Sequence, residues 1–260
     1  MVIPREHGAW FMLLISLVIG TGAARSFGLP SILLGLSAAA MFSSLYSLGE
    51  GVKKASIARE MKREAISSFI YFILALVFAA PLVIIYRFWS LLPLGLLAAP
   101  FFAIYLYLIS QRKHRTIRGE IINIAGISFP AAASYYVSSG VWTDTALLLW
   151  LLTFLYSAGS IFYVRLKVKQ KAPFPASPGQ RFLLGKELMA YLIFLFATLI
   201  ILAITGLIPF ILLAAYLPLA LKSLFSIFYS RGMMSIKRVG IAETGYSALF
   251  VALFLFTFQP

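Results

Sequence analysis

The stretch that decides the fold runs from Ile66 to Tyr86 and reads ISSFIYFILALVFAAPLVIIY. It contains no charged residue, and Arg87 follows it directly. About 20 apolar residues in a helix span the hydrocarbon core of a bilayer, which is roughly 30 Å thick. The apolar residues form a continuous run and do not alternate with polar ones. The stretch therefore favours a membrane-spanning helix over a strand of a membrane barrel.

Further apolar runs of similar length lie on both sides of this stretch, separated by short polar or charged segments. We predict an all-α, polytopic membrane helical bundle of about nine transmembrane helices. Residues 1–260 are expected to form a single transmembrane domain. The predicted helices are Ala9–Ala24, Leu29–Leu48, Ile66–Tyr86, Leu91–Ser110, Ile121–Ser139, Ala146–Tyr163, Glu187–Ile204, Ile208–Tyr229 and Val239–Phe258.

The composition agrees with a protein whose main solvent is lipid. Hydrophobic residues make up 62% of the chain and charged residues 12%, whereas a soluble domain carries roughly 25% charged residues. A net charge of +14 would suggest nucleic acid in a soluble protein. Here the charges lie in loops between apolar runs, so we expect membrane lipids with anionic headgroups as partners, and no nucleic acid. The absence of Cys excludes disulfides, thiolate metal sites and thiol nucleophiles.

Lys and Arg are distributed unevenly between alternate loops, and this asymmetry predicts the orientation. If the N-terminus is cytoplasmic, nearly all basic loop residues fall on the cytoplasmic side, and the external segments hold only Arg25 and Arg87. Basic loops are retained in the cytoplasm. We therefore expect a multi-pass protein of the cell membrane with its N-terminus cytoplasmic and its C-terminus external.

Polar residues recur at helical spacing near the predicted cytoplasmic ends. Ser43, Ser47 and Glu50 are spaced i, i+4, i+7, which places them on one face of a helix. Such stripes do not face lipid cheaply, so they face either a neighbouring helix or a wet cavity. Several stripes at one membrane depth favour a polar cavity open to the cytoplasm. The comparable stripes are Glu64/Ser68/Tyr71, Glu120/Asn123, Tyr156/Ser160/Tyr163, Lys222/Ser226/Tyr229 and Glu243/Ser247.

Charged and hydrogen-bonding residues at these ends are the candidates for binding a ligand. A Glu in the first turn of a helix also has a purely structural explanation, because it faces the positive end of the helix dipole. Lys222 has one too, since its long side chain can reach the interface. We assign no catalytic residue and no metal ligand. The candidate ligand-binding residues are Glu6, His7, Trp10, Glu50, Arg118, Glu120, Asn123, Ser160, Tyr163, Arg165, Lys222, Lys237 and Glu243.

Three stretches resemble the YwiC-like membrane proteins. The most specific is the start, Ile3-Pro4-Arg5-Glu6-His7-Gly8-Ala9-Trp10, with its His-Gly-Ala-Trp element. The others are Ser157–Arg165 (SAGSIFYVR) and Met234–Glu243 (MSIKRVGIAE). Membership of this family implies a membrane protein but no particular activity.

The predicted architecture also resembles the UbiA-type intramembrane prenyltransferases. That resemblance implies about nine helices with polar chemistry at their cytoplasmic ends, and magnesium as cofactor if a prenyl diphosphate is the substrate. The two Asp-rich motifs of those enzymes are absent. The loop after Leu48 offers Glu50, Glu60 and Glu64 instead, and the loop after Tyr163 is basic until Glu187. Magnesium needs several hard oxygen ligands, so the resemblance supports the fold better than the reaction.

Three functional hypotheses follow. The first is a UbiA-like membrane protein that acts on an isoprenoid or other lipidic substrate at the cytoplasmic leaflet. The second is a transporter or channel for a small anion or solute, which Lys222 and the polar stripes support. Its weakness is that the external halves of the helices carry few polar residues. The third is a non-catalytic membrane subunit.

Overall fold

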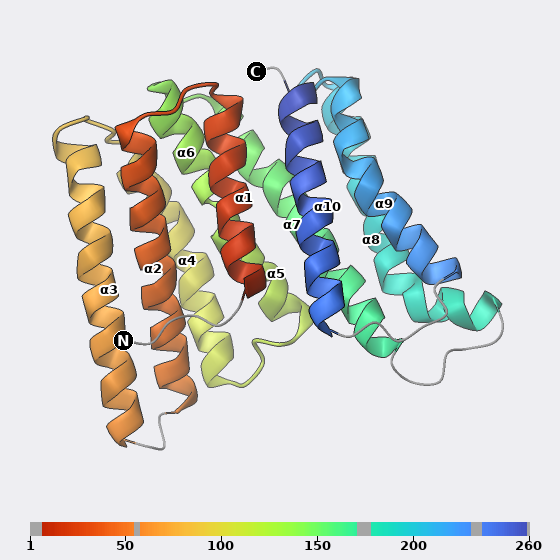
Figure 1. Cartoon of the computed structure of the whole chain (residues 1–260), viewed down its shortest axis with the longest axis horizontal. Helices are drawn as coiled ribbons and strands as arrows, with labels where there is room; N and C mark the ends of the chain where they lie inside the picture. Colours follow the sequence, from red (N-terminus) through yellow and green to blue (C-terminus); the bar gives the residue numbers. More distant parts are fainter. Residues whose placement is uncertain (1–6, 55–57, 171–177, 230–235, 259–260) are drawn as a thin grey trace. The chain divides into compact units, whose positions relative to one another are not determined.

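The computed structural model describes residues 7–54, 58–170, 178–229 and 236–258, and every regular element in this part of the chain is a helix (Figure 1). The prediction of an all-α fold is confirmed. The helices are α1 (His7–Ala23), α2 (Leu29–Lys53), α3 (Ala58–Ile84), α4 (Leu91–Ser110), α5 (Ile117–Ser128), α6 (Pro130–Ser139), α7 (Asp144–Lys169), α8 (Pro178–Ile204), the 3₁₀ turn η1 (Phe210–Leu212), α9 (Leu213–Phe228) and α10 (Ile236–Thr257).

Length and hydropathy identify eight spans in the described residues as able to cross a membrane, and Gly8–Ala23 of α1 is a shorter apolar helix. α5 and α6 count together as one of these spans. Most of the apolar windows of α3 and α4 are exposed in the isolated chain, whereas most of the α5–α6 window is buried. Large exposed side chains such as Leu96 and Val77 are the ones that lipid would cover. The chain is therefore a multi-pass membrane protein.

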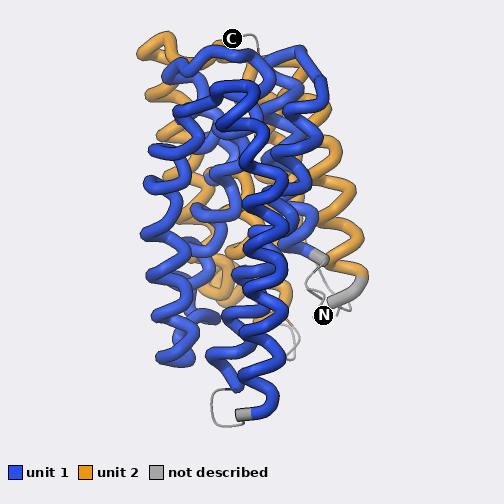
Figure 2. Tube along the Cα trace, turned by 90° about the vertical axis from the view of Figure 1, so that its left-hand side faces the viewer, with its two compact units in different colours: residues 1–154 blue, residues 155–260 orange. Residues whose placement is uncertain are grey.

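The chain falls into two compact units, residues 1–154 and 155–260, and the boundary between them lies within α7 (Figure 2). In unit 1, α2 packs along α3, α1 along α6, and α4 against α5. The α1–α6 contact is very close at Gly20, where an added Cβ would lie 2.2 Å from the carbonyl oxygen of Ala131 and 2.0 Å from Oγ of Ser134. Only glycine fits there.

The predicted continuous helix Ile121–Ser139 is wrong in one respect, because it is broken at Phe129 into α5 and α6. Pro130 is the first residue of α6. Proline has no N–H to donate, and its ring clashes with the carbonyl oxygen four residues earlier, so it starts a helix more easily than it continues one. The N–H of Phe129 bonds instead to the oxygen of Gly126 at 3.2 Å.

Several helices extend beyond the predicted apolar runs. α7 continues to Lys169 and α8 begins at Pro178, although the segment from Arg165 to Gly185 was expected to be a loop. Lys and Arg are good helix formers and interact favourably with the C-terminal end of the helix dipole. Hydropathy detects only the part of a helix that lies in the hydrocarbon. α2 similarly extends past Leu48 to Lys53.

The core of unit 2 is an aromatic stack between α7, α9 and α10. Tyr156 and Phe250 stack in parallel with ring centroids 3.6 Å apart, and Tyr216 meets Phe250 edge-on at 5.1 Å. The hydroxyl of Tyr156 lies 3.2 Å from Oγ of Ser247 and donates to it. These buried rings hold the three helices in register around the polar residues described below.

Candidate functional site

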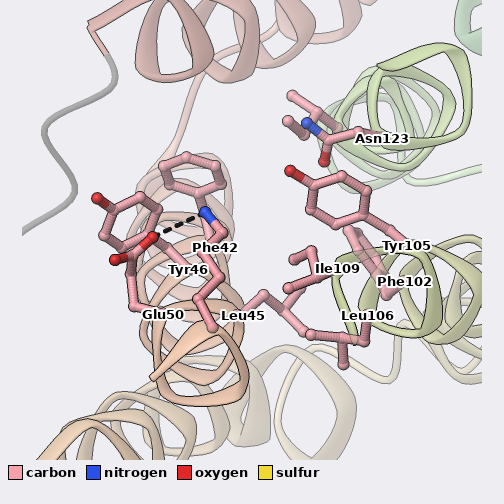
Figure 3. Close-up of a pocket in the computed structure, with 12 residues that line it drawn as sticks. Phe42, Leu45, Tyr46, Glu50, Phe102, Tyr105, Leu106, Ile109 and Asn123 are labelled. Carbon is pink, nitrogen blue, oxygen red and sulfur yellow. Dashed lines mark hydrogen bonds and ion pairs between the residues drawn. The ribbon is translucent and has the colours of Figure 1, made fainter. Parts of the chain in front are cut away.

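A pocket lies within unit 1 between α2, α4 and α5 (Figure 3). Its walls are mainly apolar and aromatic. The enclosed space measures about 40 Å³, which is room for one or a few water molecules. A larger ligand would need the lining side chains to move apart. The apolar and aromatic lining residues are Phe42, Leu45, Tyr46, Phe102, Tyr105, Leu106, Ile109 and Ile127.

One face of α2 builds a wall of this pocket. Phe42, Leu45, Tyr46, Gly49, Glu50 and Lys53 all line it, and their spacing of three and four residues places them along one side of a helix. Trp10 of α1 contacts this wall, since its ring meets that of Phe42 edge-on at 5.0 Å. Trp10 ends the His-Gly-Ala-Trp element, so this element contacts the pocket wall through one of the predicted site residues.

The pocket has polar groups on both sides. Nζ of Lys53 donates to Oε1 of Glu50 at 2.8 Å. Across the pocket, Asn123 from α5 and Tyr105 from α4 carry the facing polar atoms (Figure 3). An apolar slot with a few polar groups is typical of sites that bind amphipathic small molecules.

A second, more open hollow continues from the pocket at the end of unit 1 that carries the α4–α5 loop. Its volume is about 520 Å³, and it shares Lys53 and Ile109 with the pocket. We call it the basic groove. Its lining residues are Val52, Lys53, Ile109, Ser110, Arg112, His114 and Arg115.

His114 lies in a strongly positive environment within this groove. Its pKa is lowered from the ordinary value, first because the ring is partly desolvated and then because Lys53 and Arg115 repel the protonated form. Nδ1 is buried and has no hydrogen-bond partner among the described residues. His114 was not among the predicted site residues. A signal was available, because it is one of only two histidines and lies in a run of basic residues.

Unit 2 contains a buried ion pair between α9 and α10. Nζ of Lys222 lies 2.5 Å from Oε1 of Glu243, and the two side chains are only 2% and 14% exposed. The ammonium also sits over two aromatic faces, 4.7 Å from the ring centroid of Tyr163 and 4.9 Å from that of Tyr246. Cation–π attraction and the carboxylate together offset the cost of burying the charge.

Further buried polar atoms lie on the helices that form this pair. Nζ of Lys167 also lies over the ring of Tyr163, 5.7 Å from its centroid. Among the described residues, Oε2 of Glu243 and the Oγ atoms of Ser223 and Ser226 are buried without a hydrogen-bond partner. Buried polar atoms are normally paired, so this cluster could accept hydrogen bonds from, or donate them to, a further molecule.

The structure brings the predicted residues together in two groups, one in each unit. Glu50 and Asn123 line the pocket of unit 1, and Trp10 contacts the lining residue Phe42. Tyr163, Lys222 and Glu243 form the buried cluster of unit 2, and Ser160 and Arg165 lie nearby on α7.

The other predicted residues are not part of either group. Arg118 and Glu120 lie in the first turn of α5 and do not line the pocket. Glu6 lies outside the described residues, and only the backbone of His7 and Lys237 is described. The prediction missed Tyr105, Phe102 and Tyr246, because an isolated aromatic residue in an apolar run gives no functional signal.

Among the residues that the structure describes, no group of three or more His, Cys, Asp and Glu side chains could hold a metal ion. Glu50 is the only carboxylate among the residues that line the unit 1 pocket, and Lys53 is its ion-pair partner. The chemistry that these residues offer is countercharge and hydrogen bonding.

Comparison with known proteins identifies relatives by sequence only, since no solved structure matches the chain. The chain is 24% identical to the Bacillus subtilis (strain 168) protein YwiC, which is described as uncharacterized, over 174 residues. This match covers 65% of the chain and 68% of the relative. A family model described as YwiC-like protein matches residues 3–135 of the 260. Because that match covers just over half of the chain, the protein belongs to the YwiC-like family.

Proposed function

We propose that this membrane protein binds a lipidic ligand, an isoprenoid or another long-chain amphiphile, in the pocket between α2, α4 and α5. The observation that carries the proposal is the lining of that pocket, where aromatic and aliphatic walls meet Glu50, Lys53 and Asn123. A chain of carbon atoms would lie among the rings, and a polar head would face the Glu50–Lys53 end. The pocket lies inside a membrane bundle, where such ligands are dissolved.

The proposal concerns ligand binding at the membrane face that carries the basic loops, which we take as cytoplasmic from the positive-inside rule. Transfer of an isoprenoid group, as in the UbiA-type enzymes, would in addition need groups that stabilise a departing diphosphate. The residues near the pocket that carry charge are mainly cations, and the clustered carboxylates that would hold magnesium are not among its lining residues. Any diphosphate is therefore expected to bind with little dependence on magnesium.

A pair of matched substitutions on α4 tests the proposal. Leu106 lines the pocket, whereas Leu96 is 75% exposed on the apolar surface of the same helix. Leu106→Trp should exclude the ligand, because the larger side chain would occupy the narrow space that the lining residues must open for it. Leu96→Trp makes the same chemical change on a face that contacts lipid, and should be silent.

The first measurement is mass spectrometry of the lipids and quinones that copurify with each variant. The second compares the lipid profiles of cells that lack the protein with those of cells that carry each variant. We expect one amphiphile to copurify with wild type and Leu96→Trp and to be depleted at least about tenfold in Leu106→Trp, which corresponds to roughly 1.4 kcal/mol. Equal lipid content in all three proteins would refute the proposal, provided that thermal melting shows each of them to be folded.

The second candidate function is transport of a small anion or solute, and the Lys222–Glu243 pair in unit 2 favours it. Ionisable residues inside membrane spans commonly mark ion or proton pathways. Uptake by proteoliposomes that contain the purified protein would test it. Solute flux that is lost in Lys222→Met/Glu243→Gln, a double variant that leaves no charge of this pair buried alone, would favour transport over lipid binding if the lipid profile is unchanged.

A further inference from the structure

The basic groove of unit 1 gathers cations from two separate segments. Lys53 comes from the last turn of α2, and Arg112 and Arg115 come from the α4–α5 loop. No Asp or Glu is among the residues that line the groove. Like charges held close together repel one another, and desolvation strengthens that repulsion. Retention of basic loops in the cytoplasm requires only their charge and does not require this convergence around one hollow.

The start of α5 follows these cations directly in the chain, and its first turn carries Glu120. Thr116 is the N-cap of α5, and its Oγ1 accepts a hydrogen bond from the N–H of Gly119 at 3.3 Å. The positive end of the helix dipole therefore lies directly after Arg115 in the chain. Backbone N–H groups at such a terminus bind phosphate and similar anions. Gly119 also lets this turn fold tightly, since a Cβ there would lie 2.6 Å from the carbonyl oxygen of His114.

Carboxylates near the groove pair with two neighbouring lysines, and one of these, Lys53, lines the groove. Glu50 pairs with Lys53 at 2.8 Å, from the pocket side. Lys54 pairs with Glu60 and Glu64, and the hydrogen bond to Glu64 is the main reason that the pKa of Lys54 is raised. The charged groups that face His114 are thus Lys53 and Glu50 from α2 and Arg115 from its own loop.

We propose that the basic groove binds a phosphate-type dianion, either a phosphomonoester or a diphosphate, with Lys53, Arg112 and Arg115 as countercharges and the His114 imidazole as a hydrogen-bonding partner. Guanidinium groups suit phosphate because they can donate two parallel hydrogen bonds. The groove shares Lys53 and Ile109 with the apolar pocket. If the anion is the headgroup of a lipid held in the pocket, that part of the proposal rests on the proposed function. Binding of an anion by the groove does not depend on the proposed function.

His114 provides a direct readout of occupancy. Desolvation is the first cause of its lowered pKa, and repulsion by Lys53 and Arg115 is the second. A bound dianion would offset that repulsion, so the pKa should rise on binding. His7 is the other histidine of the chain. NMR of labelled histidine should show two imidazoles, and the signal that is missing in His114→Asn is assigned to His114. The titrations use full-length protein in phosphatidylcholine nanodiscs, with inorganic phosphate, pyrophosphate, or sodium chloride at matched ionic strength.

Arg112 and Arg87 form a matched pair for the control. Both are exposed arginines with positive φ, 56° and 57°, but Arg112 lines the groove and Arg87 lies in the α3–α4 turn. We expect the rise in the His114 pKa with phosphate or pyrophosphate in wild type and in Arg87→Gln, and its loss in Arg112→Gln. A rise that sodium chloride reproduces, or that persists undiminished in Arg112→Gln, would overturn the proposal.

A second arm separates the two sources of the anion. Nanodiscs that contain phosphatidic acid present a phosphomonoester on a lipid, and a rise there without added phosphate assigns the groove to a lipid headgroup. A rise only with inorganic phosphate or pyrophosphate assigns it to a soluble anion. Leu106→Trp should keep the phosphate response. If the wild-type protein shows no rise in the His114 pKa while its pocket still retains a lipid, the groove proposal fails and the proposed function stands.

Discussion

At the scale of single residues, the most informative feature is the Lys222–Glu243 pair. Each charge would be costly alone inside a membrane span. In the pair, each charge stabilises the other, and the Lys222 ammonium also contacts the ring faces of Tyr163 and Tyr246. Removal of one partner leaves the other buried without compensation, which costs more than the pair itself contributes.

Lys222→Met should therefore lower the free energy of unfolding by about 3–5 kcal/mol. The double variant Lys222→Met/Glu243→Gln should recover most of that loss, because no buried charge remains. Lys169→Met is the control, since its pair with Glu187 is about 40% exposed on both sides, and such pairs contribute about 1 kcal/mol or less. Denaturant or thermal unfolding in detergent measures all three. Equal losses for Lys222→Met and Lys169→Met would show that burial does not matter at this pair.

At the scale of elements, the packing of α1 on α6 depends on one small residue. A Cβ at Gly20 would overlap the backbone of Ala131 and the side chain of Ser134. Small residues at helix interfaces let backbones approach closely, and close van der Waals packing is a main source of helix association in lipid. α6 in turn follows α5, which lines the pocket, so this contact helps to position Asn123.

Gly20→Ala should destabilise unit 1 by about 1–3 kcal/mol, because the helices must separate to admit the methyl group. Gly35→Ala is the matched control in α2, where the added Cβ would meet only Cδ1 of Leu17 at 3.9 Å. That substitution should be neutral or slightly stabilising, since alanine is the better helix former. Thermal melting in detergent would compare them. A melting temperature for Gly20→Ala equal to that of Gly35→Ala would contradict the close approach.

At the scale of the whole molecule, the basic residues set the expected orientation. In unit 1, the end of α2 and the start of α3 lie at the same end as the α4–α5 loop (Figure 1). This end carries Lys53, Lys54, Arg112 and Arg115, whereas the α3–α4 turn carries Arg87. Translocation of short, strongly basic loops is disfavoured. The basic end of unit 1 should therefore be cytoplasmic, together with the segment after Lys169.

Reporter fusions test this orientation. A reporter after Pro260 should be active outside the cell, and one inserted just after Lys169 should be active inside, because these points are separated by an odd number of predicted spans. Substitution of Lys53, Arg112 and Arg115 together by Gln provides a sensitised background in which some chains should insert inverted. Finding both reporters on the same side would exclude the predicted topology.

The predictions from sequence succeeded where the cause is local. Hydropathy located the helices, since each span must satisfy its own backbone in lipid, but it misplaced the ends of α2 and α7, which leave the hydrocarbon before they stop. Pro130 was visible in the sequence, yet only the packed structure shows that it divides the predicted helix. The UbiA-like arrangement stays a prediction, because no solved structure matches the chain.

Periodicity along one helix, such as Ser43, Ser47 and Glu50, determined which face of that helix is polar. It carries no information about which neighbour that face meets. The pairing of Lys222 with Glu243, the meeting of Glu50 with Asn123 around one pocket, and the place of His114 in the groove were decided only by the tertiary structure. The physical reason is that hydrophobicity places a helix in the membrane but is nearly indifferent to its partners. Close packing at residues such as Gly20, together with hydrogen bonds and countercharges between helices, chooses among them.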